Sequence, residues 1–278
     1  MQMGNQMPKY AILSDIHANL EALNVVLEKC RAIDPEMKFL CLGDVVGYNA
    51  NPHECLELVR SLDCAGIVQG NHDQYVSKDD PEMEGFNISA KAAVVWTRSQ
   101  LSDEERAFLG RTRFREGVQG TNLTLVHATL DSPDHWGYIF DLHHAECSFS
   151  YQFTQLCFCG HSHVPVAFCK KPITSGGDRT VEAIAEWQML VDAEEHPEEF
   201  GKENCVTVKL EPGHKYLFNV GSIGQPRNHD PRASFAIYDT SAMTVSRYCL
   251  PYDIETTQAK IRAAGLPERL AARLALGI

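Results

Sequence analysis

Short apolar runs recur along the first half of the chain, and each stops at small or polar residues. Residues 9–13, 39–42 and 65–68 have the length and composition of buried strands. Between the first two runs, leucine and valine recur at helical spacing after Asn19, which suits an N-cap. Between the next two, a second amphipathic segment begins at Pro52, a residue favoured at a first helical position. This alternation predicts parallel strands in a layered α/β fold.

The rest of the chain predicts more helices and strands around one poorly patterned stretch. Expected elements are a helix at 89–100 inside a mostly helical region from 79 to 120, strands at 123–126 and 156–159, strands of a second sheet at 206–208, 216–220 and 233–238, and two short C-terminal helices within 253–276 joined at Gly265 and Pro267. Residues 173–204, with an acidic run at 192–199, are interpreted as a surface insertion. Because no repeat or linker interrupts the pattern, we expect a single domain over 1–278.

Composition and charge narrow the class of protein. The chain has 278 residues, of which 44% are hydrophobic and 22% charged, as in an ordinary globular protein. Its net charge of −12 argues against a nucleic-acid partner, although bound cations would let it accept a small anionic substrate. No apolar run is long enough to cross a bilayer, and the first nine residues lack the apolar core of a signal peptide. The ten scattered cysteines are interpreted as reduced thiols, which favours the cytoplasm.

Polar residues that can bind metals stand at the ends of the predicted strands. Since ligands gather beyond the carboxyl ends of parallel strands, these residues are expected to meet in space. They offer oxygen and imidazole donors without a thiolate, a set that suits manganese, iron or zinc. Two such ions held close together are a recurrent means of cleaving phosphate esters with water. The blocks are Asp15-Ile16-His17, Gly43-Asp44, Gly70-Asn71-His72-Asp73, His127 and Gly160-His161-Ser162-His163.

Taken singly, each block has an ordinary structural interpretation. Gly-Asp is usually a turn, and a histidine after an apolar strand is usually a hydrogen-bonded core residue. Their occurrence together, in one order and each at a strand end, is what indicates a site.

With these blocks in place, the chain resembles the calcineurin-like metallophosphoesterases. That family shows Asp-x-His, Gly-Asp, Gly-Asn-His-Asp/Glu, a later His and Gly-His-x-His, and this chain matches each block in order. Residues 14–23, 43–48 and 219–227 are similar to the small bacterial and archaeal phosphodiesterase branch. The resemblance runs from about residue 10 to 274 and is thin across 173–204. It implies a four-layer α/β sandwich of two mixed sheets flanked by helices.

The resemblance also implies roles for eight residues and a cofactor. Asp15, His17 and His163 would hold one divalent ion, while Asn71, His127 and His161 would hold a second, and Asp44 would bridge them. Manganese is the expected metal, with iron, zinc or nickel as alternatives. A water shared by the two ions would attack phosphorus as hydroxide, and His72 would donate a proton to the leaving oxygen. For Asp73, a turn-stabilising role is favoured over orienting His72.

Residues near these blocks are candidates for binding the substrate. Tyr48 should border the cleft, although a packed loop tyrosine is the alternative. Arg227 could reach a phosphate oxygen, or else lie exposed at the surface. Trp136 and Tyr138 could stack on a ring or simply cover the core. The Asp-Arg-Gly that follows the Gly-Asp block in the protein-phosphatase and dinucleoside-tetraphosphatase branches is replaced here by residues 45–49, so the arginine that helps to hold phosphate there is missing from this block.

The sequence therefore predicts a metal-dependent phosphoesterase that hydrolyses small phosphodiesters or phosphomonoesters. A phosphomonoesterase of nucleotides or sugar phosphates is the alternative within this class. A non-catalytic scaffold would be expected to lack ligands or the proton donor, and all eight positions are present. A nuclease fits poorly with the acidic balance and the lack of basic tracts. The expected partner is a small phosphate ester; neither a membrane nor a nucleic acid is expected.

Overall fold

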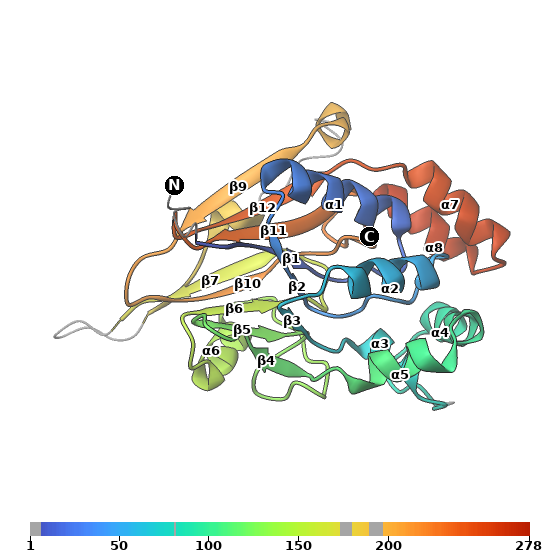
Figure 1. Cartoon of the computed structure of the whole chain (residues 1–278), viewed down its shortest axis with the longest axis horizontal. Coiled ribbons are helices and arrows are strands. Elements are labelled where there is room, and N and C mark those ends of the chain that lie inside the picture. The colour runs from blue at the N-terminus through green and yellow to red at the C-terminus, as the bar shows by residue number, and fades with distance from the viewer. Residues whose placement is uncertain (1–6, 81, 173–179, 189–196) are drawn as a thin grey trace, which may run out of the picture.

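Two mixed β-sheets form the centre of the molecule (Figure 1). The computed structural model describes residues 7–80, 82–172, 180–188 and 197–278. In spatial order, the first sheet consists of β3 (Gly66–Ile67), β2 (Lys38–Cys41), β1 (Lys9–Leu13), β11 (Ala233–Asp239), β12 (Thr244–Leu250) and β9 (Asn204–Lys209). The second consists of β4 (Arg115–Gly117), β5 (Leu123–Val126), β6 (Leu156–Cys159), β10 (Lys215–Asn219), β7 (Val166–Lys170) and β8 (Val181–Ala183).

Helices cover the outer faces of both sheets and gather at one end of the molecule (Figure 1). They are α1 (Leu20–Ile33), α2 (Pro52–Ser61), α3 (Asn71–Ser77), α4 (Ile88–Gln100), α5 (Asp103–Arg111), α6 (Leu142–Tyr151), α7 (Ile254–Ala263) and α8 (Glu268–Ala272), with the 3₁₀ turns η1 (Ala185–Gln188), η2 (Pro197–Gly201) and η3 (Arg273–Leu276). The predicted four-layer sandwich is confirmed. The predicted helices after Asn19 and at 89–100 are also present.

The alternation of side chains along β1 separates the layers. Tyr10 and Ile12 point into the core between the two sheets, whereas Ala11 and Leu13 belong to the core beneath the helices. Because both faces of β1 are covered, four of its five residues are buried. The site therefore stands on a strand that is fixed on both sides.

One sheet assignment from the sequence is wrong in part. Of the three strands expected in a second sheet, only β10 lies there, where it pairs in parallel with β6. The other two, β9 and β11, extend the first sheet, and β11 pairs antiparallel with β1. Periodicity reports which faces of a strand are buried but not which strand lies beside it, so it could not decide between the two sheets.

Parts of the chain outside the main pattern also have a defined place. Much of the expected surface insertion, residues 173–179 and 189–196, lies outside the described residues. The part between them supplies β8 to the second sheet and the buried Trp187, whose indole nitrogen donates to the carbonyl of Asn219 (2.8 Å). At the C-terminal helices, Gly265 has a φ of 70°, as its predicted capping position requires.

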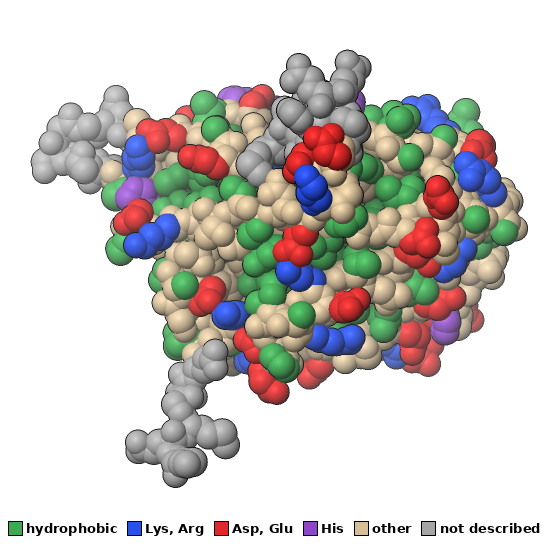
Figure 2. All heavy atoms as spheres, turned by 90° about the horizontal axis from the view of Figure 1, so that it is seen from above, with side chains coloured by type: hydrophobic (Ala, Val, Ile, Leu, Met, Phe, Trp, Pro, Cys, Tyr) green, Lys and Arg blue, Asp and Glu red, His purple; other side chains and the backbone are tan. Residues whose placement is uncertain are grey.

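The surface charges, the cysteines and the lengths of the helices can be compared with what the composition suggested. On the face shown in Figure 2, Asp and Glu side chains are interspersed with Lys and Arg. All ten cysteines lie among the described residues, and each is a free thiol. Within the same residues, no helix combines the length and the apolar character needed to span a bilayer.

Candidate metal centre

The five polar blocks meet at the carboxyl ends of four strands. Asp15 follows β1, Asp44 follows β2, His127 follows β5 and His161 follows β6. Asn71 is the first residue of α3, which begins where the chain leaves β3. Residues separated by up to 148 positions, Asp15 and His163, thus come within 3.2 Å of each other.

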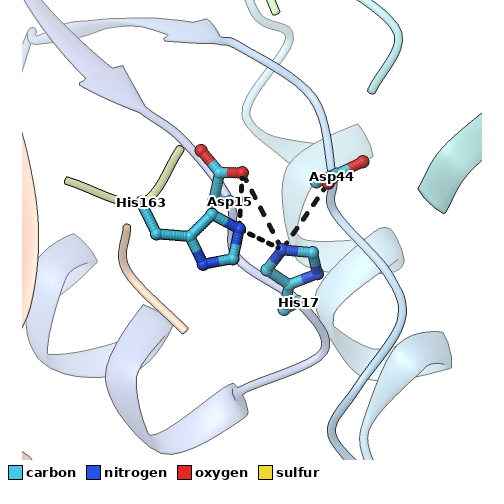
Figure 3. Close-up of side chains that lie close together, drawn as sticks. All are labelled: Asp15, His17, Asp44 and His163. Atoms are coloured by element: carbon cyan, nitrogen blue, oxygen red, sulfur yellow. Dashed lines mark hydrogen bonds and ion pairs between the residues drawn. The ribbon is translucent and has the colours of Figure 1, made fainter. Parts of the chain in front are cut away.

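The first donor group combines two carboxylates and two imidazoles (Figure 3). Its four members, Asp15, His17, Asp44 and His163, are buried, and one donor atom from each lies within 4.8 Å of the others. The Nε2 atom of His163 lies 3.2 Å from Oδ1 of Asp15, and that of His17 lies 3.6 Å from Oδ2 of Asp44. The two Nε2 atoms are 3.1 Å apart. This group could hold a divalent ion.

The second donor group shares Asp44 with the first. It adds His127 and His161, again with donor atoms within 4.8 Å of one another. Nε2 of His127 lies 3.4 Å from Oδ2 of Asp44. The side-chain oxygen of Asn71 lies 3.0 Å from Nδ1 of His161, which brings a neutral oxygen donor to the same place. The two groups are therefore adjacent, with one carboxylate between them.

Backbone carbonyls turn the imidazoles toward these groups. Nδ1 of His17, His127 and His163 lies 3.1, 2.7 and 2.5 Å from the carbonyl oxygens of Val46, Leu42 and Gln225. Each Nδ1–H can donate to its carbonyl, and the lone pair of each Nε2 then points into the site. In His161 the Nε2 faces the carbonyl of Trp136 (2.9 Å), so its free lone pair is on Nδ1. Such outer partners are typical of metal-binding histidines.

Three buried polar atoms in the middle of the site have no hydrogen-bond partner among the described residues. They are Oδ1 of Asp15, Oδ2 of Asp44 and Nε2 of His127. A buried carboxylate oxygen without a partner is costly unless a cation satisfies it. The other carboxylate oxygens are occupied: Oδ2 of Asp15 accepts from the backbone of His161 (3.1 Å), and Oδ1 of Asp44 accepts from that of His72 (2.8 Å). The residues present therefore fit divalent metal ions.

Charge interactions in the cluster shift the acidity of its members. Burial alone would raise the pKa of Asp15 and Asp44, but the imidazoles of His163 and His127 hold the pKa of both carboxyls well below their usual range. Burial alone would lower the pKa of His127, but the carboxylates of Asp44 and Asp15 raise that pKa to about 9. Burial lowers the pKa of His161 to about 3. Both carboxylates are thus ionised at neutral pH and available to a cation.

Backbone strain is concentrated at the same residues. Asp15, His17, Asp44, His161 and His163 all have φ between 48° and 67°, in the left-handed region that side chains rarely adopt. Such conformations cost on the order of 1–3 kcal/mol each and persist only where surrounding structure imposes them. Their gathering in one cluster is typical of a functional site.

Two glycines leave the room that the carboxylates need. A Cβ on Gly70 would lie 2.1 Å from Oδ1 of Asp44, and a Cβ on Gly160 would lie 2.4 Å from Oδ2 of Asp15. The glycines of two sequence blocks therefore permit the close approach that brings the carboxylates into the cluster.

His72 lies over the cluster without joining either donor group. Its ring packs between Tyr48 and Phe86, with centroid distances of 4.3 and 4.5 Å, and its Nδ1 has no partner among the described residues. Burial lowers the pKa of His72 to about 4. Asp73 instead accepts from the backbone amides of Val45 (3.0 Å) and Gly70 (3.2 Å), which is the turn-stabilising role favoured from the sequence.

A cleft of about 680 Å³ opens over the cluster. Tyr48 and Arg227 line it together, and an Nη2 of Arg227 donates to the Tyr48 hydroxyl (3.1 Å). Trp136 and Tyr138 also line it, and the Tyr138 ring stacks on His161 at 4.5 Å. The lining residues that were missed from the sequence include Phe86, Arg269 and Arg273. The two arginines are four residues apart at the end of the chain, and only that spacing could have suggested a shared face.

Comparison with known proteins identifies the class. Residues 9–183 match the family model for the calcineurin-like phosphoesterase superfamily domain. The chain belongs to this superfamily, and its fold and buried Asp/His cluster agree with that membership.

Relatives align along nearly the whole chain. An uncharacterised protein of Methanocaldococcus jannaschii, MJ0912, is 36% identical over 271 residues, which is 96% of this chain and 97% of that protein. A metallophosphoesterase structure from Sphaerobacter thermophilus is 34% identical with a TM-score of 0.76, covering 99% of this chain and 100% of that one. The hypothetical protein PH1004 of Pyrococcus horikoshii OT3 shares the fold, with 20% identity, a TM-score of 0.72 and coverage of 98% and 99%.

Proposed function

We propose that the protein is a phosphoesterase that uses two divalent ions to hydrolyse small phosphodiesters or phosphomonoesters. The observation that carries the proposal is the pair of donor groups sharing Asp44, with unpartnered carboxylate oxygens facing between them. Asp15, His17 and His163 would hold one ion, Asn71, His127 and His161 the other, and Asp44 both. When bound, the two ions would activate a water and neutralise charge on the phosphate. Manganese is the metal we expect, in a cytoplasmic enzyme with reduced thiols.

His72 is proposed to donate the proton that the leaving oxygen needs. Its place in the wall of the cleft, outside both donor groups, supports this role. In the metal-free protein, burial lowers the pKa of His72 to about 4, and an approaching phosphate anion favours the protonated ring.

Two other functions have less support. A nuclease would need a basic surface, whereas the chain carries a net charge of −12 and mixes both signs of charge on the face in Figure 2. A non-catalytic scaffold has no need for eight buried polar groups in one cluster, five of them in strained backbone. Tyr48 and Arg227, at the edge of the cluster, are proposed to contact the substrate.

A hydrolysis panel tests the proposal directly. The protein is stripped of metal, restored with manganese, nickel, iron or zinc, and assayed on bis(p-nitrophenyl) phosphate and p-nitrophenyl phosphate. We expect metal-dependent hydrolysis, with the ratio of the two rates separating phosphodiesterase from phosphomonoesterase activity. If none of the four metals restores hydrolysis of these two substrates or of alkyl phosphate esters, the proposed phosphoesterase activity is refuted.

Asp44→Asn tests the shared carboxylate. The amide keeps the size of the side chain but removes the charge that both donor groups use, so metal content should fall from about two ions per chain to below one, with activity at least about 100-fold lower. Elemental analysis measures the first effect. Asp131→Asn, an exposed aspartate, is the matched control. Full occupancy by two ions in Asp44→Asn would contradict the shared role.

A further inference from the structure

The wall of the cleft beside His72 is built from arginines. Arg227, Arg269 and Arg273 all line the cleft that contains His72 and Asp44. Tyr48 connects them to the site: its ring lies 4.3 Å from that of His72 and 5.7 Å from the guanidinium carbon of Arg227. The arginine wall therefore begins one side chain away from the proposed proton donor.

None of these three arginines forms an ion pair with an acidic side chain of the described residues. No Asp or Glu side chain in the described part of the chain lies within 4.0 Å of these three guanidinium groups, although the chain has 37 acidic residues against 25 Lys and Arg. Other arginines do find such partners: Arg60, Arg106, Arg232 and Arg262 each form an ion pair. Glu84 and Asp134 also line the cleft, but neither pairs with the three arginines.

The three arginines border the same cleft and have hydrogen-bond donors to spare. Burial, and after it the charges of Arg227 and Arg269, lower the pKa of Arg273 to about 10. Arg227 uses Nη2 for Tyr48 and Gln225, and its buried Nε has no partner among the described residues. Arg273 donates from Nε to the terminal carboxyl oxygen of Ile278 and keeps its Nη donors for other partners. Like charges gathered in this way are stabilised when an anion binds between them.

We propose that Arg227, Arg269 and Arg273 form a subsite for a second anionic group, a phosphate or a carboxylate, carried by the alcohol that leaves in the reaction. The position beside His72 places the subsite on the leaving-group side, so this assignment rests on the proposed function. Arg269 and Arg273 lie beyond residue 183, where the match to the family model ends. The substrate class is then a phosphate ester whose leaving alcohol is itself an anion, and the subsite supplies phosphate-matching donors in a chain that lacks the Asp-Arg-Gly block.

Anion binding to the metal-free protein tests the arginines without any need for catalysis. Isothermal calorimetry with inorganic phosphate should give binding that weakens at least about tenfold in Arg269→Gln and further in Arg269→Gln/Arg273→Gln, since each substitution removes a charged hydrogen-bond donor to the phosphate. Arg262→Gln, outside the cleft and paired with Glu268, is the control. If Arg273→Gln does not fold because its contact with Ile278 is lost, Arg273→Lys replaces it: lysine keeps the positive charge but lacks the paired donors of a guanidinium group. Phosphate binding equal in all variants would overturn the subsite.

Inhibition of the metal-loaded enzyme then tests which anion is held. Propane-1,3-diol monophosphate, its bisphosphate and 3-(phosphooxy)propanoate share a three-carbon chain and differ only in the second group. The wild type should bind the preferred doubly anionic compound at least about tenfold more tightly than the monophosphate, and Arg269→Gln/Arg273→Gln should lose that preference. Equal inhibition by all three in the wild type would overturn the assignment. An enzyme inactive with every metal that still binds phosphate through these arginines would refute the proposed function and leave the anion subsite standing.

Discussion

Three imidazoles of the candidate metal centre are oriented by main-chain carbonyls of residues outside the five metal-binding blocks. Leu42, Val46 and Gln225 accept from Nδ1 of His127, His17 and His163. The tautomer of each ring is therefore set by the path of the backbone, and side-chain substitutions at the three acceptors would leave the carbonyls in place. The identities of the donor residues could be predicted from the sequence blocks because the chemistry resides in those side chains. Their orientation could not, since it depends on loops whose φ values are unusual.

The sequence pattern also did not reveal that Arg269 and Arg273 line the cleft. They reach the cleft because Leu270 and Leu274 pack, with Tyr48, into the small core that joins the C-terminal helices to α4. Leu270 and Leu274 determine how the C-terminal helices pack, and the arginines lie at the cleft because they precede these leucines in the chain. A sequence pattern reveals the buried face of such a helix but not which cavity its other side borders.

Replacement of His72 by glutamine should separate proton donation from metal binding. The variant keeps a polar side chain of similar reach but cannot act as an acid, so turnover of an alkyl phosphate ester should fall by about 10²–10⁴. Turnover of a p-nitrophenyl ester, whose leaving group needs no proton, should fall far less. Steady-state kinetics on the two substrates measure the difference, and elemental analysis should show unchanged metal content. Wild-type turnover of the alkyl ester would contradict the acid role.

At the scale of elements, the sequence predicted the parallel half of the first sheet better than the rest. A helix between two strands favours a parallel pair, and β1, β2 and β3 are parallel as the alternation predicted, although periodicity did not give their order in the sheet. The strands β9 and β11 were placed in the wrong sheet, because an antiparallel partner can lie anywhere along the chain.

Trp187 was not identified from the sequence as a core residue, because its segment is poorly patterned. Its ring is nevertheless fully buried, and its indole nitrogen donates to the carbonyl of Asn219. The side chain of Asn219 in turn donates to the carbonyl of Gly160 (2.6 Å).

The turn between β3 and α3 supports an element-scale prediction. Gly70→Ala would bring a methyl group to within 2.1 Å of Oδ1 of Asp44, although the φ of −93° at this position suits any residue. The overlap should cost about 1–3 kcal/mol of unfolding free energy and displace Asp44 from both donor groups. Denaturant unfolding and elemental analysis measure the two effects. Gly117→Ala, where no atom lies within 4 Å of the added Cβ, is the control. Unchanged metal content in Gly70→Ala would show that the turn can relax.

At the scale of the whole molecule, the metal centre ties the two sheets together. Asp15 and Asp44 come from the first sheet, whereas His127, His161 and His163 follow strands of the second or the loops beyond them. Ions held by both sets would stabilise the folded chain by mass action, by about 2.7 kcal/mol for a ligand at 100 times its Kd. Without ions, the same carboxylates are stabilised by imidazolium charge instead, and this makes the metal-free protein sensitive to pH.

Deprotonation of His127 should destabilise the metal-free protein at alkaline pH. Its pKa is raised to about 9 in the fold and is about 6.5 when unfolded, so its charge stabilises the metal-free protein fully below pH 6.5. That stabilisation is lost as the pH rises through 9, and it should amount to about 2 kcal/mol between pH 7 and 9. His127→Gln has no proton to lose, so its unfolding free energy should decline less over the same interval. Urea unfolding of both metal-free proteins at pH 7, 8 and 9 measures the difference. With metal added, His127 must be neutral to bind, so the affinity for metal should increase as the pH rises from 7 to 9. Parallel declines in the wild type and His127→Gln would show that the buried pair of His127 and Asp44 does not carry this charge.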